Sequence, residues 1–356
     1  MTSSRRLPAL ISGAVALSLA LGGCSIGDFA SDLLTSAGKD ALAHAALAAT
    51  VSDLESLDVV EAASYELQAD TYLGDIGRLS MTVAANIDGA QLTQLADELR
   101  ESFDAIEQVA VEPQASVTLA GDTAGKFDLW QLPETNEAVV ENFEFWRAAS
   151  AAVETELWVE LLPGPGSSVG MRSIAIAPES DLDEATDHVI DNYAALQRVT
   201  LVNDDVENYW QLAGIKSLRE LAPLSYVELV SDLRVILPLF SYPLDSDAVR
   251  GDSDFPEGFS VSWAPPGGEY GVSGVIVSNN EYTDEALGAA IQAAARTSEI
   301  EGVNFQFVAG DREFWMHTTT CSGSVDGTTD DELFFAQLAA SGANLSSTAG
   351  PGACIP

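Results

Sequence analysis

Acidic side chains form the densest group in this sequence that could do chemistry. They crowd one stretch of the chain, 242–258. Calcium binds six to eight oxygens, often on a flexible loop. The spacing departs from an EF-hand loop, because Val249 stands where an oxygen is expected and Gly251 comes one position late. The loop is still rich in carboxylate oxygens, so we treat it as a calcium candidate. The candidate ligands are Asp245, Asp247, Asp252, Asp254 and Glu257.

A histidine on an expected helix is a second candidate for chemistry. Glu184 lies four positions before His188, and Asp191 lies three positions after it. Residues at these spacings share one helix face. Carboxylates and an imidazole can bind a metal ion. The same spacing is also typical of a solvated row of ion pairs opposite an apolar stripe, so both interpretations stay open.

A serine motif at 166–170 is the remaining catalytic pattern. Gly-Ser-Ser-Val-Gly matches the nucleophile elbow of hydrolases, which requires a turn from a strand into a helix. Here the motif falls in a Pro/Gly turn between two expected strands. We therefore expect a non-catalytic binding or scaffold protein. Fifty-five acidic residues leave one alternative open, an exported hydrolase that uses carboxylates as acid and base.

Trp158 is an aromatic residue that could take part in binding. It alternates with Leu157 and Val159 in an expected strand, so its side chain is expected on the opposite face of the sheet. An aromatic ring on an open sheet face can bind a glycan or a protein partner.

The amino-terminal residues have the features of an export signal. Arg5 and Arg6 precede an apolar run, Leu7–Leu21, that is shorter than the roughly 20 residues of a membrane span. The run ends in Leu21-Gly22-Gly23-Cys24, which resembles the lipobox of bacterial lipoproteins in its order of aliphatic, small, small and cysteine.

This resemblance implies how the protein is held and where. In lipoproteins the signal, here 1–23, is cleaved and the new terminal cysteine, here Cys24, is diacylated. Two acyl chains give stable anchoring, whereas one gives marginal binding. We expect Sec export and a location on the extracytoplasmic face of the cell membrane. The expected partners are membrane lipid through acylated Cys24, and an envelope protein or a small-molecule ligand.

The charge of the chain excludes one class of partner. Fifteen basic and 55 acidic residues give a net charge of −40, and removal of 1–23 would take away two arginines and leave −42. Nucleic-acid binding requires lysine and arginine to neutralise phosphates, so it is not expected. No polybasic attraction to anionic lipid is expected either, which leaves the acyl chains to hold the protein.

Two of the three cysteines remain for a disulfide. Cys321 and Cys354 form a natural pair in an oxidising exterior. A crosslink over 33 positions contributes about 3.5–4 kcal/mol in the chain-entropy model. We expect it to hold the carboxy-terminal tail on the last strand.

Hydrophobic periodicity predicts the order helix, strand, strand, repeated about six times. Period-two alternation at 65–69 and 79–87 indicates strands, and the apolar spacing after Asp88 indicates a helix. A helix at 136–153, one opened by Asp181 and one at 217–237 broken near Pro223 continue the pattern, with strands expected near 199–202 and 209–212. The expected class is α+β, with tandem two-layer sandwiches built from ferredoxin-like αββαββ units, antiparallel sheets and helices on one face.

The expected domains follow from grouping these units in pairs. A mature chain of this length suggests two or three domains. The expected divisions are a cleaved signal at 1–23, a lipidated cysteine and helical tether at 24–57, three α+β domains at 58–133, 134–214 and 215–320, and a disulfide-held tail at 321–356. The helix of the tether is either a free spacer or packed on the first domain.

Overall fold

The computed structural model describes residues 27–70, 74–121, 125–163, 169–177, 180–199, 207–212, 214–238, 257–265, 273–300, 303–310, 312–317 and 329–341. Within these ranges, side chains are described except at 27–37, 70, 169, 315–317, 329–333 and 335.

The described elements follow the predicted order of helix, strand, strand. The helices are α1 (Gly27–Glu55), α2 (Gly89–Glu107), α3 (Asn136–Val153), α4 (Leu182–Asp191), α5 (Tyr193–Leu196), α6 (Leu224–Arg234), α7 (Asp284–Thr297) and α8 (Thr329–Ala340). The strands are β1 (Val60–Asp70), β2 (Gly74–Val83), β3 (Glu112–Leu119), β4 (Lys126–Leu129), β5 (Leu157–Pro163), β6 (Val169–Ile176), β7 (Glu207–Leu212), β8 (Ile215–Leu218), β9 (Gly258–Trp263), β10 (Gly274–Asn279), β11 (Asn304–Ala309) and β12 (Arg312–His317).

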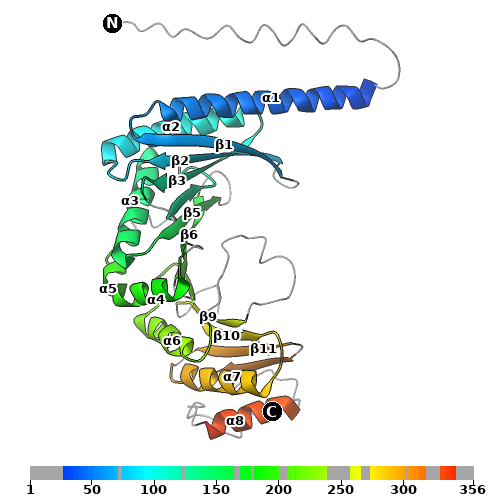
Figure 1. The fold of residues 1–356 in the computed structure, drawn as a ribbon, viewed down its shortest axis with the longest axis vertical. Helices are drawn as coiled ribbons and strands as arrows, with labels where there is room; N and C mark the ends of the chain where they lie inside the picture. Colours follow the sequence, from blue (N-terminus) through cyan, green and yellow to red (C-terminus); the bar gives the residue numbers. More distant parts are fainter. Residues whose placement is uncertain are drawn as a thin grey trace.

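These strands form one mixed sheet in which the spatial order is the chain order. Each hairpin is antiparallel, as in β1–β2 and β11–β12, and each helical crossover joins parallel neighbours, as in β2–β3 and β10–β11. Parallel neighbours need a crossover, and right-handed crossovers place successive helices on one face. The result is a curved molecule with α3, α5, α4 and α6 on the outside and the strands on the inside (Figure 1).

The sheet is continuous across the boundaries that were expected between domains. Across the boundary at 133/134, β4 pairs with β5, and across 214/215, β7 pairs with β8. The structure is therefore a mixed α/β protein with one mixed sheet and helices on one face. The expectation of antiparallel sheets was wrong, because every pair joined through a helix is parallel. The division into three domains stays a prediction about folding units.

Local sequence explains where the helices begin. Asp88 accepts a hydrogen bond from the Gln91 backbone, and the Gln91 side chain accepts one from the Asp88 backbone, which completes a capping box before α2. Thr135 caps α3 and Thr283 caps α7, each with a side-chain oxygen that accepts a hydrogen bond from the backbone three residues later. Asp181 caps α4, as the sequence predicted.

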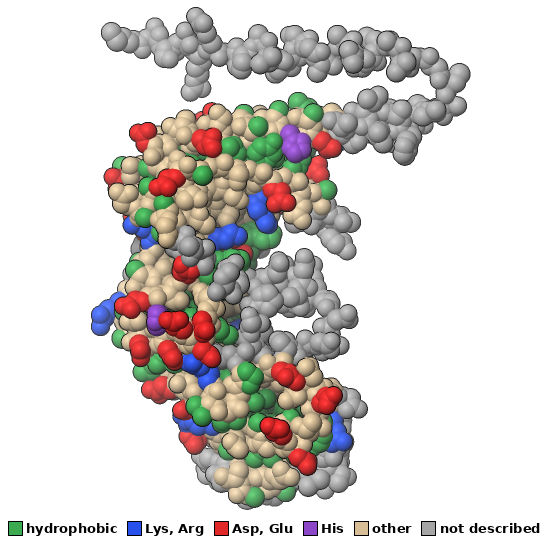
Figure 2. All heavy atoms as spheres, viewed as in Figure 1, with side chains coloured by type: hydrophobic (Ala, Val, Ile, Leu, Met, Phe, Trp, Pro, Cys, Tyr) green, Lys and Arg blue, Asp and Glu red, His purple; other side chains and the backbone are tan. Residues whose placement is uncertain are grey.

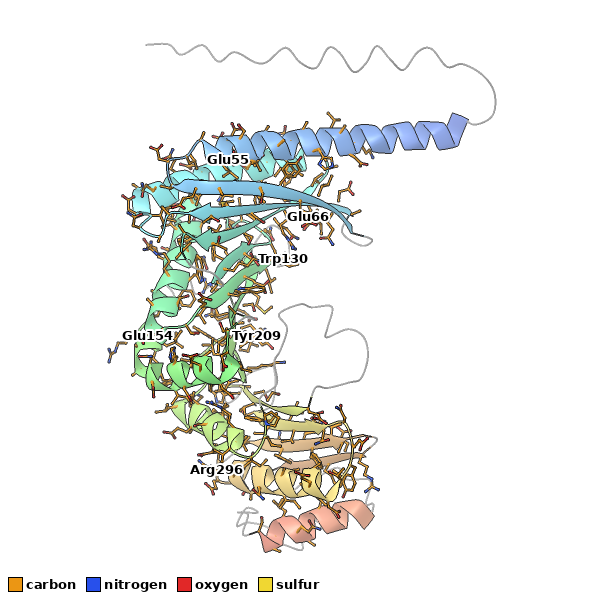
Figure 3. The ribbon with its side chains drawn as sticks, viewed as in Figure 1. Glu55, Glu66, Trp130, Glu154, Tyr209 and Arg296 are labelled. Carbon is orange, nitrogen blue, oxygen red and sulfur yellow. The ribbon has the colours of Figure 1, made fainter. Side chains whose placement is uncertain are left out.

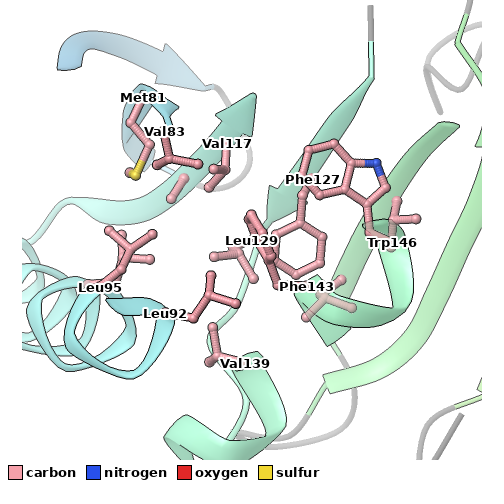
Figure 4. Close-up of a cluster of buried hydrophobic side chains, with 14 of the residues drawn as sticks. Met81, Val83, Leu92, Leu95, Val117, Phe127, Leu129, Val139, Phe143 and Trp146 are labelled. Carbon is pink, nitrogen blue, oxygen red and sulfur yellow. The ribbon is translucent and has the colours of Figure 1, made fainter. Parts of the chain in front are cut away.

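The buried apolar side chains form two clusters. The first lies between the helices and β1–β7 and includes Leu95, Val117, Phe127, Phe143 and Trp146, which are labelled in Figure 4. The second lies mainly under α6, α7 and α8, against β8–β12. Both clusters border Leu221, which is partly buried against each.

Helix α1 is packed on the sheet and also extends beyond it. Its side chains at Ala43, Leu47 and Leu54 are buried in the first cluster, which excludes the free-spacer interpretation for this part of the helix. Gly77 of β2 permits the contact, because a Cβ there would lie 2.8 Å from Cδ2 of Leu47. The amino-terminal part of α1 projects past the strands (Figure 1).

One expected helix is partly a strand. The segment predicted as a helix at 217–237 begins as β8 and turns helical only at Leu224, after Pro223. Four alternating residues are too few to distinguish a short strand from a first helical turn by periodicity. The strand expected near 199–202 is not seen at Val199, and 200–202 lie outside the described residues.

Candidate functional site

A line of polar side chains crosses the face of the sheet that carries no helices. Direct register partners link one residue on each of seven neighbouring strands. Side chains alternate between faces, so residues one position away, such as Val117 and Val159, enter the core instead. We call this line the polar row: Ser64, Ser80, Ser116, Asp128, Glu160, Ser173 and Tyr209.

The middle of the polar row is buried although it lies on the inner side of the curved sheet. Asp128 and Glu160 are each 9% exposed, and Ser116 and Ser173 are also buried. Tyr209 lies on the inner side, whereas Glu154 and Arg296 lie on the outer, helical side (Figure 3). Burial of polar groups costs free energy unless they are hydrogen-bonded, so this arrangement requires partners.

A second row lies beside the first and carries two of the three lysines. Lys126, Trp158, Ala175, Gln211 and Lys216 are successive register partners on β4–β8. The Lys126 ammonium lies 2.8 Å from the Asp128 carboxylate and 4.7 Å from the centre of the Trp158 ring. The ion pair and the cation–π contact together fix these three side chains against one another.

Two buried polar atoms at this site have no hydrogen-bond partner in the described part of the chain. They are Nε2 of Gln114, on β3, and Oδ1 of Asp128, on β4. Nη2 of Arg78 donates to the Gln114 side-chain oxygen over 3.2 Å, which orients the amide and leaves its nitrogen as a donor. An unsatisfied buried polar group costs about 1–3 kcal/mol. Each such group in a folded protein calls for an explanation, and a bound molecule is one.

Burial also changes the acidity of two groups on the inner face. Desolvation lowers the pKa of the Lys216 ammonium and raises the pKa of the Tyr209 phenol. Both shifts disfavour the charged form, which is the effect expected where water is partly excluded.

Two carboxylates lie side by side in the polar row. Asp128 and Glu160 are register partners on the parallel strands β4 and β5, whose backbones are about 4.8 Å apart. Such a pair can accept hydrogen bonds from a ligand, or serve as an acid and a base.

A separate groove lies at one end of α3 and has a volume of about 840 Å³. Its walls combine carboxylates with small apolar residues, and Ser150 Oγ is buried there without a partner in the described chain. The guanidinium of Arg147 in this groove donates to the Ile87 carbonyl over 2.8 Å. The groove does not include any residue of the polar row.

The structure tests only part of the metal hypotheses. Asp245, Asp247, Asp252 and Asp254 lie outside the described residues, and Glu257 is exposed. Within the ranges given above, no three His, Cys, Asp or Glu side chains are close enough to hold a metal ion. The calcium site stays a prediction.

His188 has a structural contact instead of a metal cluster. Its Nδ1 lies 2.8 Å from the backbone oxygen of Glu154, the residue that ends α3 in a left-handed conformation (φ 52°). Since a carbonyl only accepts, Nδ1 carries the proton. This contact joins α4 to the end of α3.

Other predicted positions fall outside the described residues. These are Cys24, Cys321 and Cys354, together with 166–168 of the serine motif. Trp158 is described, and its register confirms the predicted position on the face opposite Leu157 and Val159.

Sequence reasoning did not find the polar row. Its members occupy the polar positions of alternating strands, which usually face water. The sequence carried one indication of the polar row: Lys126 and Asp128 place opposite charges two positions apart on one strand face. The sequence could not show that neighbouring strands bring Gln114 and Glu160 beside them.

The comparisons with known proteins give no relative: the chain matches no protein-family model, no curated protein and no solved structure. Among the described helices, none combines the length and apolar character needed to cross a bilayer.

Proposed function

We propose that this chain is a lipid-anchored, extracytoplasmic binding protein that holds a polar ligand on the inner face of its sheet. The observation that carries this proposal is the pair of unsatisfied buried atoms, Gln114 Nε2 and Asp128 Oδ1. A ligand that bonded both would remove their desolvation cost on binding. A binding site of this kind needs no catalytic constellation.

The anchor is supported by the sequence and is compatible with the fold. Helix α1 begins three positions after Cys24 and projects past the sheet (Figure 1). Along its described side chains, Ala43 is the first that is buried. An acylated Cys24 would therefore be separated from the curved sheet by a helical spacer.

The anchor is tested by expressing the full chain in a bacterium and measuring the intact mass of the protein purified from the membrane fraction. We expect loss of residues 1–23 and addition of a diacylglyceryl group at Cys24. Cys24→Ser should leave the export segment uncleaved by the lipoprotein pathway and remove the lipid mass. A soluble, unmodified wild-type chain that retains residues 1–23 would refute the anchor.

The binding function is tested by native mass spectrometry of protein purified from its producing cells in a mild detergent. We expect a non-covalent adduct on the wild-type protein and its loss from Asp128→Leu, which removes both carboxylate oxygens. Asp104→Leu makes the same chemical change on the exposed surface of α2 and should keep the adduct. An adduct that survives Asp128→Leu would place the site elsewhere.

A second candidate function is hydrolysis by a carboxylate pair. It is favoured by the adjacency of Asp128 and Glu160, since retaining glycosidases use two carboxyl groups about 5–5.5 Å apart. Turnover of glycosides by the wild-type protein, abolished by Glu160→Gln, would support it. Binding without turnover would leave the first proposal.

The finer architecture is also a proposal. We infer that pairs of αββ units act as ferredoxin-like folding modules, now joined edge to edge. Support comes from the two apolar clusters, because the second contains only residues of the last units and the junction before them.

A further inference from the structure

We propose that the ligand of the polar row is an uncharged carbohydrate, held by hydroxyl groups that bond Gln114 Nε2 and Asp128 Oδ1. This inference rests on the proposed binding function and names the chemical class of the ligand. It follows from three properties of the inner face: the type of its unsatisfied atoms, the balance of its charges and the position of its aromatic rings.

The two unsatisfied atoms need opposite partners. Gln114 Nε2 is a donor and requires an acceptor, whereas Asp128 Oδ1 is an acceptor and requires a donor. A hydroxyl group can fill either role, and neighbouring hydroxyls on one molecule can fill both. Oδ2 of Asp128 is already in contact with the Lys126 ammonium, so Oδ1 is the oxygen left for a ligand.

The charges at the centre of the inner face balance. The basic groups there are Arg78, which donates to Gln114, and the two lysines Lys126 and Lys216. They are matched by the carboxylates of Glu66, the register partner of Arg78, and of Asp128 and Glu160 on neighbouring strands. This balance stands out in a chain with 55 acidic and 15 basic residues. Figure 2 shows acidic side chains spread over the visible face of the described part of the chain.

A balanced surface favours an uncharged ligand. A polyanion would require an excess of lysine and arginine, and a cation would require carboxylates without nearby ammonium groups. Nucleic acid is disfavoured by the same argument.

An aromatic ring on the same face completes the site. The register of β3, β4 and β5 places Gln114 two positions along the strands from Asp128, and Trp158 two positions the other way. A ligand that contacts all three therefore spans about 10 Å across the strands and about 13 Å along them. Aromatic rings offer a large apolar surface beside polar groups, which suits the mixed faces of a sugar ring. The Lys126 ammonium holds the Trp158 ring in place by its cation–π contact.

The test is calorimetric titration with maltohexaose, cellohexaose, xylohexaose and N,N′-acetylated chitohexaose as probes, and with hyaluronan and spermine as charged comparisons. We expect at least one uncharged oligosaccharide to bind the wild-type protein. Asp128→Leu and Gln114→Leu, which remove the polar side-chain atoms, should each weaken its binding about tenfold or more. Asp104→Leu should leave it unchanged.

A readout on the wild-type chain keeps the test informative if a variant fails to fold. Reductive ¹³C-methylation labels only Lys39, Lys126, Lys216 and the terminal amine. Added oligosaccharide should move the NMR signal of Lys126, which lies over Trp158, and leave that of Lys39 unchanged. Binding heat with an unmoved Lys126 signal would refute the site.

The two proposals fail in different ways. If none of the uncharged probes binds, the carbohydrate inference is wrong. An adduct of another chemical class that depends on Asp128 would still support the binding function. Absence of any Asp128-dependent adduct would remove both.

Discussion

Arg172 is the most deeply buried charged side chain in the described part of the chain, at 1% exposed. It lies on the helical face of β6, where Nε donates to Asn142 Oδ1 over 2.6 Å and Nη1 donates to Asn208 Oδ1 over 2.7 Å. The guanidinium also lies 5.4 Å from the centre of the Phe145 ring. Burial lowers the pKa of Arg172 to about 10.

Replacement of Arg172 by methionine tests this contact. Methionine fills much of the volume but leaves the side-chain oxygens of Asn142 and Asn208 without their donor. We expect Arg172→Met to lower the free energy of unfolding by about 1–3 kcal/mol in urea titrations. The loss should be constant from pH 5 to 9, because arginine stays protonated in both states below its folded pKa.

Asn142→Ala provides the matched comparison for Arg172→Met. If the two side chains interact as described, the double variant should be less destabilised than the sum of the single ones. A more stable Arg172→Met protein would mean that desolvation of the charge outweighs its hydrogen bonds.

The lowered pKa of Lys216 gives a prediction about pH. Because burial disfavours the charged ammonium, the unfolded chain binds more protons between the folded pKa and 10.5. The contribution of Lys216 to stability therefore improves as pH rises through that window, and its penalty is complete below it. In ¹³C-methyl NMR titrations, one lysine signal should titrate below the ordinary value and disappear in Lys216→Arg. A normal titration of all three lysines would contradict this.

At the scale of elements, hydrophobic periodicity predicted most of the helices and strands but not which strands pair with each other. The helix expected at 136–153 is α3, with the same limits, and Asp88 and Asp181 are caps as predicted. Period-two alternation marks a buried face but carries no information about which strand lies at each edge. The single continuous sheet, and with it the polar row, therefore required the structure.

The contact of α1 with β2 can be tested at Gly77. A Cβ at this position would lie 2.8 Å from Leu47 Cδ2 and 2.9 Å from Val111 Cγ1. We expect Gly77→Ala to lower the free energy of unfolding by about 1–3 kcal/mol, measured by urea denaturation. In a Leu47→Ala background, which lacks the nearest atom, Gly77→Ala should cost less than it does in the wild-type chain. An additive double variant would refute the contact.

At the scale of the whole molecule, the two apolar clusters suggest two regions of different stability. Leu229, a residue of α6, is fully buried in the second cluster. Leu229→Ala should cost about 2–5 kcal/mol through the cavity it leaves. Hydrogen exchange should then accelerate in β9–β11 and α7, and change little in β1–β4. Equal acceleration in both regions would mean that the sheet unfolds as one unit.

The agreement between spatial order and chain order has a consequence for synthesis. Each strand pairs only with the strands immediately before and after it in sequence. When a strand leaves a ribosome or a translocation pore, the preceding strand with which it pairs has therefore already emerged. Its pairing does not depend on a distant part of the polypeptide. Short loops of this kind close at low entropic cost, so assembly can advance vectorially from the amino terminus, hairpin by hairpin.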